Sequence, residues 1–436
     1  MNTSVDAEYE QLPRSFHLPR AARWLLLVAS LACIVASYVH TFRAPQNRLS
    51  DFAGYYTAAK LVATGDSVAS MYDDQWFIGR LGQFGILDRK MVFYVNPPPV
   101  SLLMTPLAGL DPEIAKGLWI GINLGIVLLV IYLLNTHLRI PSRTGLNEVI
   151  LALVVCSVPF LRNIQRGQIY LLMLLLIVLM WKGYDSRRPW LTGVSLAFLL
   201  LFKYFGWMFI LLLLTEKRWK ELGWTGVTFI TCTGICIRLL GVDMYIRHVE
   251  RLLTSLRAFD VASTGLPSLP ALFGGLFVAH PSWNTMPVAD SPLLASALIF
   301  VSLILLLALT LRTHRRIAAE HRPGGFLSIL VLSVLFTPLA ADHHYILLAL
   351  PLFFAVMWME RISFVSGYFL LLGVTMYLLL GLLPNLPIDH FSGWFKLFAF
   401  GRVYGALLLW FLLISTCTRM VNRTSGEHRG PIVGNA

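Results

Sequence analysis

The 436-residue chain is 57% hydrophobic, has a mean hydropathy of +0.69 and carries charge on only 13% of its residues. A soluble fold cannot bury so many apolar segments long enough to cross roughly 30 Å of hydrocarbon, so the composition predicts an all-α, polytopic membrane protein. The net charge of +12 is spread over short loops rather than gathered in one patch. This distribution excludes nucleic acid as a partner and fits the excess of Lys and Arg that cytoplasmic loops carry.

Hydrophobic runs predict about twelve membrane spans, and most Lys and Arg residues outside the two longest loops fall on one side if the N-terminus is cytoplasmic. This topology predicts cytoplasmic tails over residues 1–22 and 421–436 and a single membrane domain over residues 23–420. The predicted spans are Trp24–Tyr38, Ile114–Leu134, Leu146–Phe160, Gln168–Lys182, Trp190–Leu201, Tyr204–Leu214, Gly223–Gly241, Ser291–Leu311, Phe326–Pro338, Tyr345–Met359, Phe364–Leu383 and Arg402–Thr418.

A long loop of mixed polarity, residues 41–97, follows the first span on the outer side. It carries the runs Asp51–Tyr56 and Tyr94–Pro99. The loop is too irregular to span the membrane and too polar to bury. We therefore expect short amphipathic helices on the membrane surface, whose apolar side chains lie in the interface: Met71, Trp76, Phe77 and Phe84.

The apolar segments on either side of Lys203 are each too short for a simple span. One long helix is an alternative, which would invert the sidedness of every later loop. We favour a helix that is broken at Lys203, because breaks are tolerated where the backbone lines a cavity rather than lipid. Lys203 could also snorkel to the interface, but between two apolar half-helices a lysine is costly unless it meets an anion.

The second long outer loop, residues 242–290, contains the basic amphipathic segment Tyr245–Phe259 with Arg247, Arg251 and Arg257 roughly on one side. We interpret this loop as a lid or an acceptor-binding element.

The topology gathers ionisable and polar residues at the outer ends of the helices, where such a group is a functional-site hypothesis. Alternatives remain for individual residues. Asp51 could cap a helix, and Arg162 and Arg166 could anchor lipid headgroups. Consecutive side chains on a helix point about 100° apart, so only one of His343 and His344 would face a given cavity. The gathered residues are Asp51, Arg162, Arg166, Gln168, Lys203, Asp342, His343 and His344.

The order of these motifs resembles the polyprenyl-phosphate-sugar-dependent glycosyltransferases of family 87, which are membrane enzymes of the GT-C fold. The resemblance covers most of residues 25–420. One departure is Tyr204, which follows Lys203 in a stretch where the family has a proline. The matching motifs are Asp51-x-x-x-Tyr55-Tyr56-x-Ala-Ala, Met71-Tyr72-Asp73, Tyr94-x-Asn96-Pro97-Pro98, Thr105-Pro106-Leu107-Ala108, Arg166-Gly167-Gln168, Lys203, and Thr337-Pro338 followed by His343-His344.

The resemblance implies transfer of a sugar, mannose by family default, from a polyprenyl-phosphate donor to a glycolipid or polysaccharide acceptor. The reaction would take place at the outer, periplasmic face of a bacterial inner membrane, with Asp51 as the general base of an inverting displacement. The resemblance further implies donor-phosphate contacts from Lys203, His343, His344, Arg162 and Arg166, and sugar or acceptor contacts from Tyr55, Tyr56, Tyr94, Asn96 and Gln168.

We expect no cofactor and no required metal. Asp73-Asp74 is the only adjacent acidic pair on the first outer loop, and it lies well beyond Asp51. The alternative from another class is a secondary transporter or a carrier of polyprenyl-phosphate sugars. However, the chain shows no internal repeat, and its polar residues gather at one membrane face rather than at the midplane. A carrier needs cations for the phosphate but no base, so Asp51 separates the two hypotheses.

Overall fold

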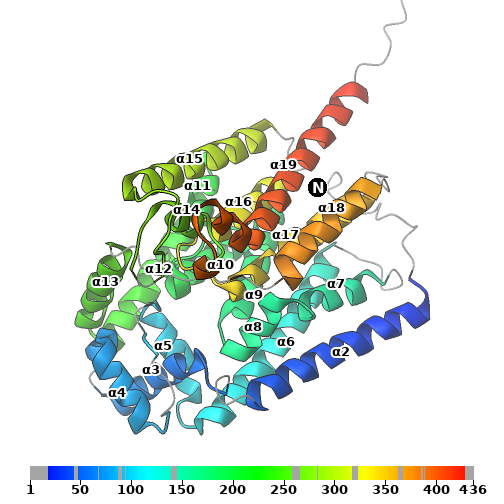
Figure 1. Ribbon diagram of the computed structural model, residues 1–436. Helices are drawn as coiled ribbons and strands as arrows, with labels where there is room; N and C mark the ends of the chain where they lie inside the picture. The colour runs from blue at the N-terminus through cyan, green and yellow to red at the C-terminus, as the bar shows by residue number, and fades with distance from the viewer. Residues whose placement is uncertain are drawn as a thin grey trace, which may run out of the picture. The chain divides into compact units, whose positions relative to one another are not determined.

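The computed structural model describes residues 18–43, 48–66, 68–86, 91–93, 95–138, 145–257, 266–281, 283–316, 323–361, 367–383, 386 and 388–427. Over these residues the regular structure is helical, and the one β interaction is an isolated bridge between His280 and Asn284. The prediction of an all-α protein is confirmed for this part of the chain (Figure 1).

The chain divides into two compact units. In the described residues, the N-terminal unit comprises residues 18–257 together with the short return segment 341–347. The C-terminal unit comprises residues 266–340 and 348–427. The segment 341–347 carries the predicted histidine pair, so the chain returns to the N-terminal unit to deliver these two residues.

The N-terminal unit contains the first outer loop and the following apolar helices, and α2 packs along α7 and α8 (Figure 1). Its helices are α2 (Arg20–Arg43), α3 (Phe52–Thr64), η2 (Val68–Tyr72), α4 (Asp74–Gln83), α5 (Pro99–Met104), η3 (Thr105–Leu107), α6 (Pro112–Leu138), α7 (Leu146–Val155), α8 (Val158–Arg166), α9 (Tyr170–Asp185), α10 (Pro189–Lys203), α11 (Trp207–Thr215), α12 (Trp219–Leu240), α13 (Val242–Arg257) and the 3₁₀ helix η6 (Asp342–Leu348).

The predicted span Leu146–Phe160 is wrong in one respect, because it is two helices bent by 57°. Helix α7 ends at Val155, and Ser157 caps α8 by accepting a hydrogen bond from the Phe160 N–H at 3.3 Å. Pro159 occupies the first turn of α8, where its missing N–H costs nothing, but it could not continue α7. Both break signals are present in the sequence.

The predicted break at Lys203 is confirmed. Helix α10 ends at Lys203, and α11 begins at Trp207. Between them Tyr204 has φ 51° and Gly206 has φ 93°, both left-handed conformations that end a helix. Two half-helices therefore meet at this lysine.

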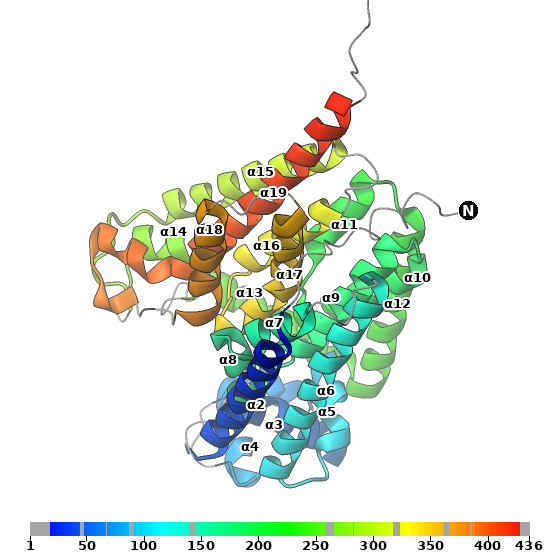
Figure 2. The same ribbon diagram turned by 90° about the vertical axis from the view of Figure 1, so that its right-hand side faces the viewer.

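The C-terminal unit is organised around α16, whose residues Phe326–Phe336 are all buried against α15, α17 and α19 (Figure 2). Its helices are α14 (Leu269–Phe277), α15 (Pro292–Arg316), α16 (Pro323–Leu335), α17 (Ala349–Arg361), α18 (Gly367–Tyr377), the π-helical turn η7 (Leu378–Leu382), η8 (Ile388–His390), η9 (Gly393–Phe400) and α19 (Gly401–Glu427).

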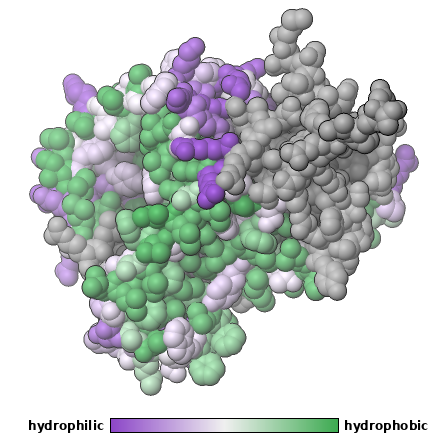
Figure 3. Space-filling view, turned by 90° about the horizontal axis from the view of Figure 1, so that it is seen from above, coloured by the Kyte–Doolittle hydropathy of each residue, from purple (hydrophilic) through white to green (hydrophobic). Residues whose placement is uncertain are grey.

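Within the described residues, five helices are long and apolar enough to cross a membrane, or six if the bent pair α7 and α8 forms one span. The described part of each predicted span falls mostly on helix, but several of these helices are shorter, so the number of about twelve spans stays a prediction. In α2, α12 and α15, no more than 17% of the most apolar window is buried. Apolar side chains cover broad areas of the surface, as membrane-spanning helices require (Figure 3).

The helices of the first outer loop are short, as predicted, but two of the four apolar residues expected in the membrane interface are buried within the protein. Helix α3 is buried over most of its length, and Met71 and Phe77 have no exposed surface. Helices α3 and α5 pack together, and α13 of the second outer loop packs on η2. The loop therefore forms its own small core, because its apolar side chains bury one another instead of meeting lipid.

Candidate active site

The Asp51 side chain stands at the start of α3 but does not cap this helix. Its backbone occupies the N-cap position, yet the side chain accepts no hydrogen bond from the first turn. Instead, Asp51 Oδ2 accepts hydrogen bonds from Arg166 Nη1 at 3.2 Å and from Gln168 Nε2 at 2.8 Å. Oδ1 has no hydrogen-bond partner in the described part of the chain, and 21% of the side chain is exposed. One carboxylate oxygen is held, and the other is open to a ligand.

A turn at Gly167 makes these contacts possible. Gly167 ends α8 with φ 63°, and its N–H donates to the carbonyls of Asn163 and Ile164. A Cβ at this position would lie 2.7 Å from Phe52 Cβ, which real Cβ atoms essentially never do. Glycine therefore lets the end of α8 contact the start of α3 at Phe52. Because Asp51 precedes Phe52, this contact brings Arg166 and Gln168 next to Asp51.

Two side chains of α6 bind the carbonyl groups of the same turn. The fully buried Lys116 donates to the Gln165 carbonyl at 2.6 Å. Trp119 Nε1 lies 3.1 Å from the Gly167 oxygen and 3.3 Å from that of Gln168. Carbonyls at a helix C-terminus lack partners within the helix and favour a nearby cation. Lys116 and Trp119 therefore stabilise the turn that positions the partners of Asp51.

Lys203 belongs to the same polar cluster. Its Nζ donates to Asn96 Oδ1 at 2.5 Å and lies 5.8 Å from the ring centres of both Tyr55 and Tyr170. The described residues place no carboxylate within ion-pair distance of this ammonium group. The Asn96 carbonyl in turn accepts a hydrogen bond from the Tyr72 hydroxyl at 2.9 Å.

Tyr55 joins the two halves of the cluster. Its hydroxyl donates to Gln168 Oε1 at 2.5 Å, while the same Gln168 amide donates to Asp51. Burial raises the pKa of Tyr55 well above its usual value, and the neighbouring Tyr170 and Asp51 act in the same direction. Tyr55 is therefore a neutral hydrogen-bond donor that fixes the orientation of the Gln168 amide.

His343 and His344 are both buried and stack on each other with ring centres 4.7 Å apart. The Tyr170 ring packs against both. Burial lowers the pKa of each ring well below its usual value, and the charges of Lys203 and Arg166 act in the same direction. Both rings are therefore neutral near pH 7. The Asn163 amide donates to the His343 carbonyl at 2.8 Å and ties this segment to α8.

Arg162 lies one helical turn before Arg166 on α8. Its Nη1 donates to Gln165 Oε1 at 2.9 Å, and its Nε lies 3.7 Å from Asp342 Oδ2. The predicted phosphate ligands thus all belong to the N-terminal unit, and each is linked to another of them directly or through shared neighbouring residues. These ligands are Arg162, Arg166, Lys203, His343 and His344.

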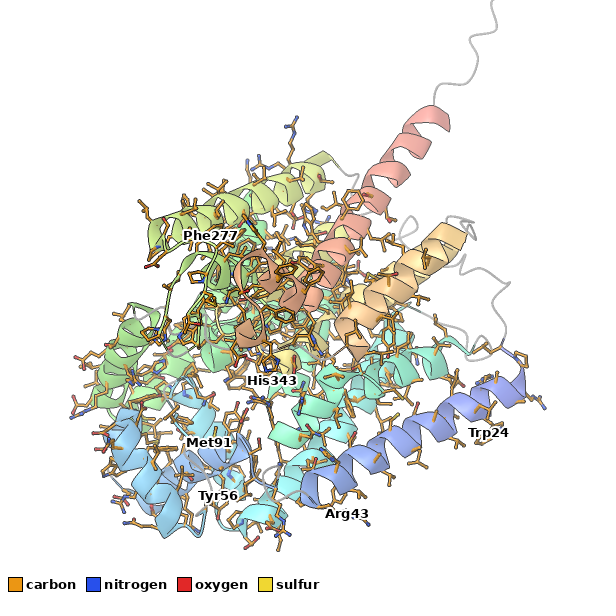
Figure 4. All side chains as sticks on the ribbon, viewed as in Figure 1. Trp24, Arg43, Tyr56, Met91, Phe277 and His343 are labelled. Carbon is orange, nitrogen blue, oxygen red and sulfur yellow. The ribbon has the colours of Figure 1, made fainter. Side chains whose placement is uncertain are left out.

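One of the predicted residues, Tyr56, is not brought into this cluster. Tyr56 turns its hydroxyl to the Leu110 carbonyl at 2.7 Å, and its ring lies near Phe52 among the helices of the first outer loop (Figure 4). Tyr94 lies outside the described residues. Asn96 and Gln168 do belong to the cluster, where their side chains form hydrogen bonds with protein groups.

An apolar groove of about 200 Å³ opens between α2, α6 and α8. It is lined by side chains such as Tyr38 of α2, Ile120 of α6 and Ile164 of α8. Ile164 lies on the same helix as Arg166, so the groove adjoins the helix that supplies the partner of Asp51.

The adjacent acidic residues of the first outer loop have structural partners. Asp73 caps α4 by accepting hydrogen bonds from the N–H groups of Gln75 and Trp76, and Asp74 pairs with Arg251 of α13 at 2.5 Å. The described residues contain no group of three His, Cys, Asp or Glu side chains that could hold a metal ion.

Acidification from pH 7 toward pH 4 should loosen α13 from the first outer loop. His248 of α13 hydrogen-bonds to the Tyr204 hydroxyl at 2.8 Å and packs on Tyr72, and burial lowers its pKa from 6.5 to about 4. The ring binds a proton more readily when α13 is detached, so the packing is fully stable above pH 6.5 and weakens as the pH falls. The neighbouring Tyr72 has a raised pKa and does not titrate in this range.

Hydrogen exchange of α13, corrected for the intrinsic pH dependence of exchange, measures this effect. Protection should decrease between pH 6.5 and 4.5 in the wild type but not in a His248→Phe variant, which keeps the ring packing without the titrating group. Equal corrected protection across this range in the wild type would contradict the expectation.

Sequence reasoning missed four residues of this cluster: Lys116, Trp119, Asn163 and Tyr170. A signal for Lys116 existed, because an ionisable residue inside a predicted span is itself a functional or structural marker. Tyr170 and Asn163 had no comparable signal. Their roles depend on the turn at Gly167 and on the return of residues 341–347, and neither contact can be found from local spacing.

No curated protein and no solved structure matches the chain. The model of glycosyltransferase family 87 matches residues 94–340, more than half of the 436 residues. The match includes Asn96, the turn at Gly167 and Lys203, and it ends before His343. Asp51 lies before the matched stretch. The protein therefore belongs to glycosyltransferase family 87.

Proposed function

We propose that this family 87 glycosyltransferase moves a sugar, with mannose as the first choice, from a polyprenyl-phosphate donor to an acceptor hydroxyl. The acceptor is a glycolipid or an envelope polysaccharide, and the reaction takes place at the periplasmic face of a bacterial inner membrane. The fold is GT-C with about twelve spans. Membership of the family supports glycosyl transfer in a membrane protein.

One observation carries the mechanism: the Asp51 carboxylate is held through Oδ2, while Oδ1 stays open beside a cluster that also contains Lys203. A general base must keep a fixed orientation and still present a lone pair to the proton that it removes. Arg166 and Gln168 hold the orientation. Oδ1, which has no described hydrogen-bond partner, supplies the lone pair.

The leaving phosphate needs cations, and Lys203 is suited to this role. It is an ammonium with three N–H donors, of which Asn96 uses one, and no described carboxylate lies within ion-pair distance of it. A half-buried cation without a direct ion pair is costly, and a phosphate ligand would reduce this cost. Arg166, Arg162 and one histidine of the pair are further candidates for phosphate contacts.

In the proposed reaction, Asp51 removes the proton of the acceptor hydroxyl while its oxygen forms a bond to the anomeric carbon of the sugar. The bond from that carbon to the phosphate oxygen breaks, and its electron pair leaves with the polyprenyl phosphate. Attack from the face opposite the phosphate inverts the configuration, so a β-linked donor gives an α-linked product. The leaving group is an acid anion, so no second carboxyl group is needed as a proton donor, unlike in glycosidases.

The surroundings support a lipid-linked donor. The apolar groove between α2, α6 and α8 offers prenyl units a surface next to the helix that carries Arg166. We propose further that the reaction needs no metal. Asp73 and Asp74, the adjacent acidic pair on the loop, are engaged by the N-terminus of α4 and by Arg251.

The test uses the full-length protein in lipid vesicles with a crude envelope-lipid acceptor. The donors are polyprenyl-phosphate mannose, glucose and arabinose, with GDP-mannose and UDP-glucose for comparison. We expect one lipid-linked donor to be consumed with release of polyprenyl phosphate, an α-linked sugar in the product, and the same rate in EDTA. Consumption of a nucleotide sugar alone would refute the proposed donor class. Binding of lipid-linked donors and their movement across vesicles without any transfer would favour a carrier instead.

A further inference from the structure

Tyr170 places a buried hydroxyl group at the centre of the site, although no sequence motif marks this residue. It is the first residue of α9, two positions after Gln168. Its ring packs against the histidine pair, and its ring centre lies 4.1 Å from that of His344 and 5.0 Å from that of His343. The Lys203 ammonium lies 5.8 Å from its ring centre. Tyr170 therefore links the histidine pair to the cation proposed to bind phosphate.

Both ring nitrogens of His344 are engaged. The backbone N–H of Ala341 donates to Nδ1 at 3.0 Å, and Nε2 lies 2.5 Å from the Tyr170 hydroxyl oxygen. A backbone N–H can only donate, so Nδ1 carries a lone pair and the neutral ring carries its proton on Nε2. His344 therefore donates to Tyr170, and neither nitrogen is left for a direct contact with substrate.

This assignment determines the role of the Tyr170 hydroxyl. Its oxygen accepts the His344 proton, so its own proton remains to be donated. Within the described residues, His344 is its only hydrogen-bond partner. The other tyrosine beside Lys203, Tyr55, already donates to Gln168. Buried hydroxyl groups are satisfied with few exceptions, so a donor left over beside a phosphate-binding cation points to an anionic ligand.

We propose that the Tyr170 hydroxyl donates a hydrogen bond to a phosphate oxygen of the lipid-linked donor, next to Lys203, and that His344 is a positioning residue that acts through Tyr170. This inference rests on the proposed function. It separates the two histidines. His344 orients the tyrosine, whereas the buried Nδ1 of His343 has no hydrogen-bond partner among the described residues, so this ring is left for another contact.

The kinetic test compares Tyr170→Phe, His344→Leu, His344→Gln and the double variant Tyr170→Phe/His344→Leu. A hydrogen bond to a charged group that is made in the transition state corresponds to a fall in kcat of about 10- to 100-fold when it is lost. We expect this fall in Tyr170→Phe and in His344→Leu, with the KM for the acceptor unchanged. The double variant should be no worse than either single variant, because both changes remove the same contact. His344→Gln keeps an N–H near Nε2 and should recover part of the rate.

The matched control is Tyr404→Phe, which removes a hydroxyl bonded to the Leu397 carbonyl in the C-terminal unit. It should keep the wild-type rate. Losses that multiply in the double variant would show that His344 acts without Tyr170 and would overturn the inference, as would a wild-type rate in Tyr170→Phe.

A binding arm distinguishes this inference from the proposed function. Polyprenyl phosphate and the phosphate-free polyprenol are titrated into wild-type protein and Tyr170→Phe. We expect the variant to bind polyprenyl phosphate about tenfold more weakly, and polyprenol equally well. If the wild type does not distinguish polyprenyl phosphate from polyprenol, the proposed function fails and the inference fails with it. If the wild type does distinguish them and the variant binds the phosphate as tightly, only the role of Tyr170 is refuted.

Discussion

Replacement of Asp51 by asparagine should reduce sugar transfer by about 10²- to 10⁴-fold, the range that general-base catalysis contributes. Asparagine has the same shape and keeps one oxygen that can accept a hydrogen bond from Arg166 or Gln168. It cannot take a proton from the acceptor hydroxyl. The hydrogen bonds of Lys203 and Tyr170 do not involve Asp51, so binding of the lipid-phosphate donor should remain.

The measurement pairs turnover of the lipid-linked sugar with binding of polyprenyl phosphate for the same preparation. Asp66→Asn provides the matched control, because Asp66 lies on the same outer loop and also bonds to an arginine, Arg80, at 3.1 Å. It should keep the wild-type rate. An Asp51→Asn protein that turns over as fast as the wild type would exclude Asp51 as the base. A variant that loses binding together with turnover would give Asp51 a structural role in holding Arg166 and Gln168.

The sequence alone was sufficient to find the residues of this site that are unusual for a membrane protein. Arg166 and Lys203 are charged groups next to long apolar runs, where charge is costly and rare, and Asp51 opens a motif on the loop after the first span, so all three can be found without a structure. The break at Lys203 could also be predicted, because two apolar runs of half a span each cannot cross the bilayer separately.

Residues whose roles depend on long-range contacts could not be predicted in this way. Tyr170 looks like any aromatic residue at the end of a span, and its meaning comes from His344, which lies 174 positions later in the chain. Tyr56 shows the opposite error. It neighbours Tyr55 in sequence, but successive helical side chains diverge, so Tyr55 reaches Gln168 while Tyr56 reaches Leu110.

The apolar residues of the first outer loop are predicted to meet lipid because the loop is too irregular to span the membrane and too polar to bury. The structure packs α3 against α5 and η2 against α13, so these side chains have protein partners. A helix buried on most faces has no reason to be amphipathic, and α3 is such a helix. This burial makes α3 a firm support for Asp51.

Gly167→Ala should have the second-largest effect on turnover, through the position of the Asp51 partners rather than through chemistry. Alanine in a left-handed conformation costs about 1–2 kcal/mol. In addition, the new Cβ would lie 2.7 Å from Phe52 Cβ, an atom fixed to the backbone of α3. The end of α8 must therefore move away from α3, which separates Arg166 and Gln168 from Asp51. We expect turnover to fall by at least about tenfold, because small misplacement of a catalytic group is costly.

Gly65→Ala separates the two causes. Gly65 ends α3 with φ 68°, and its N–H bonds to the carbonyls three and four residues earlier, as in Gly167, but a Cβ there would meet nothing within 4 Å. This variant should show the conformational cost alone, as a lower thermal midpoint in detergent with a wild-type rate. Gly167→Ala should show a larger loss of stability together with the loss of turnover. If both variants lose stability equally and both keep their turnover, the contact between Gly167 and Phe52 does not position the catalytic carboxylate.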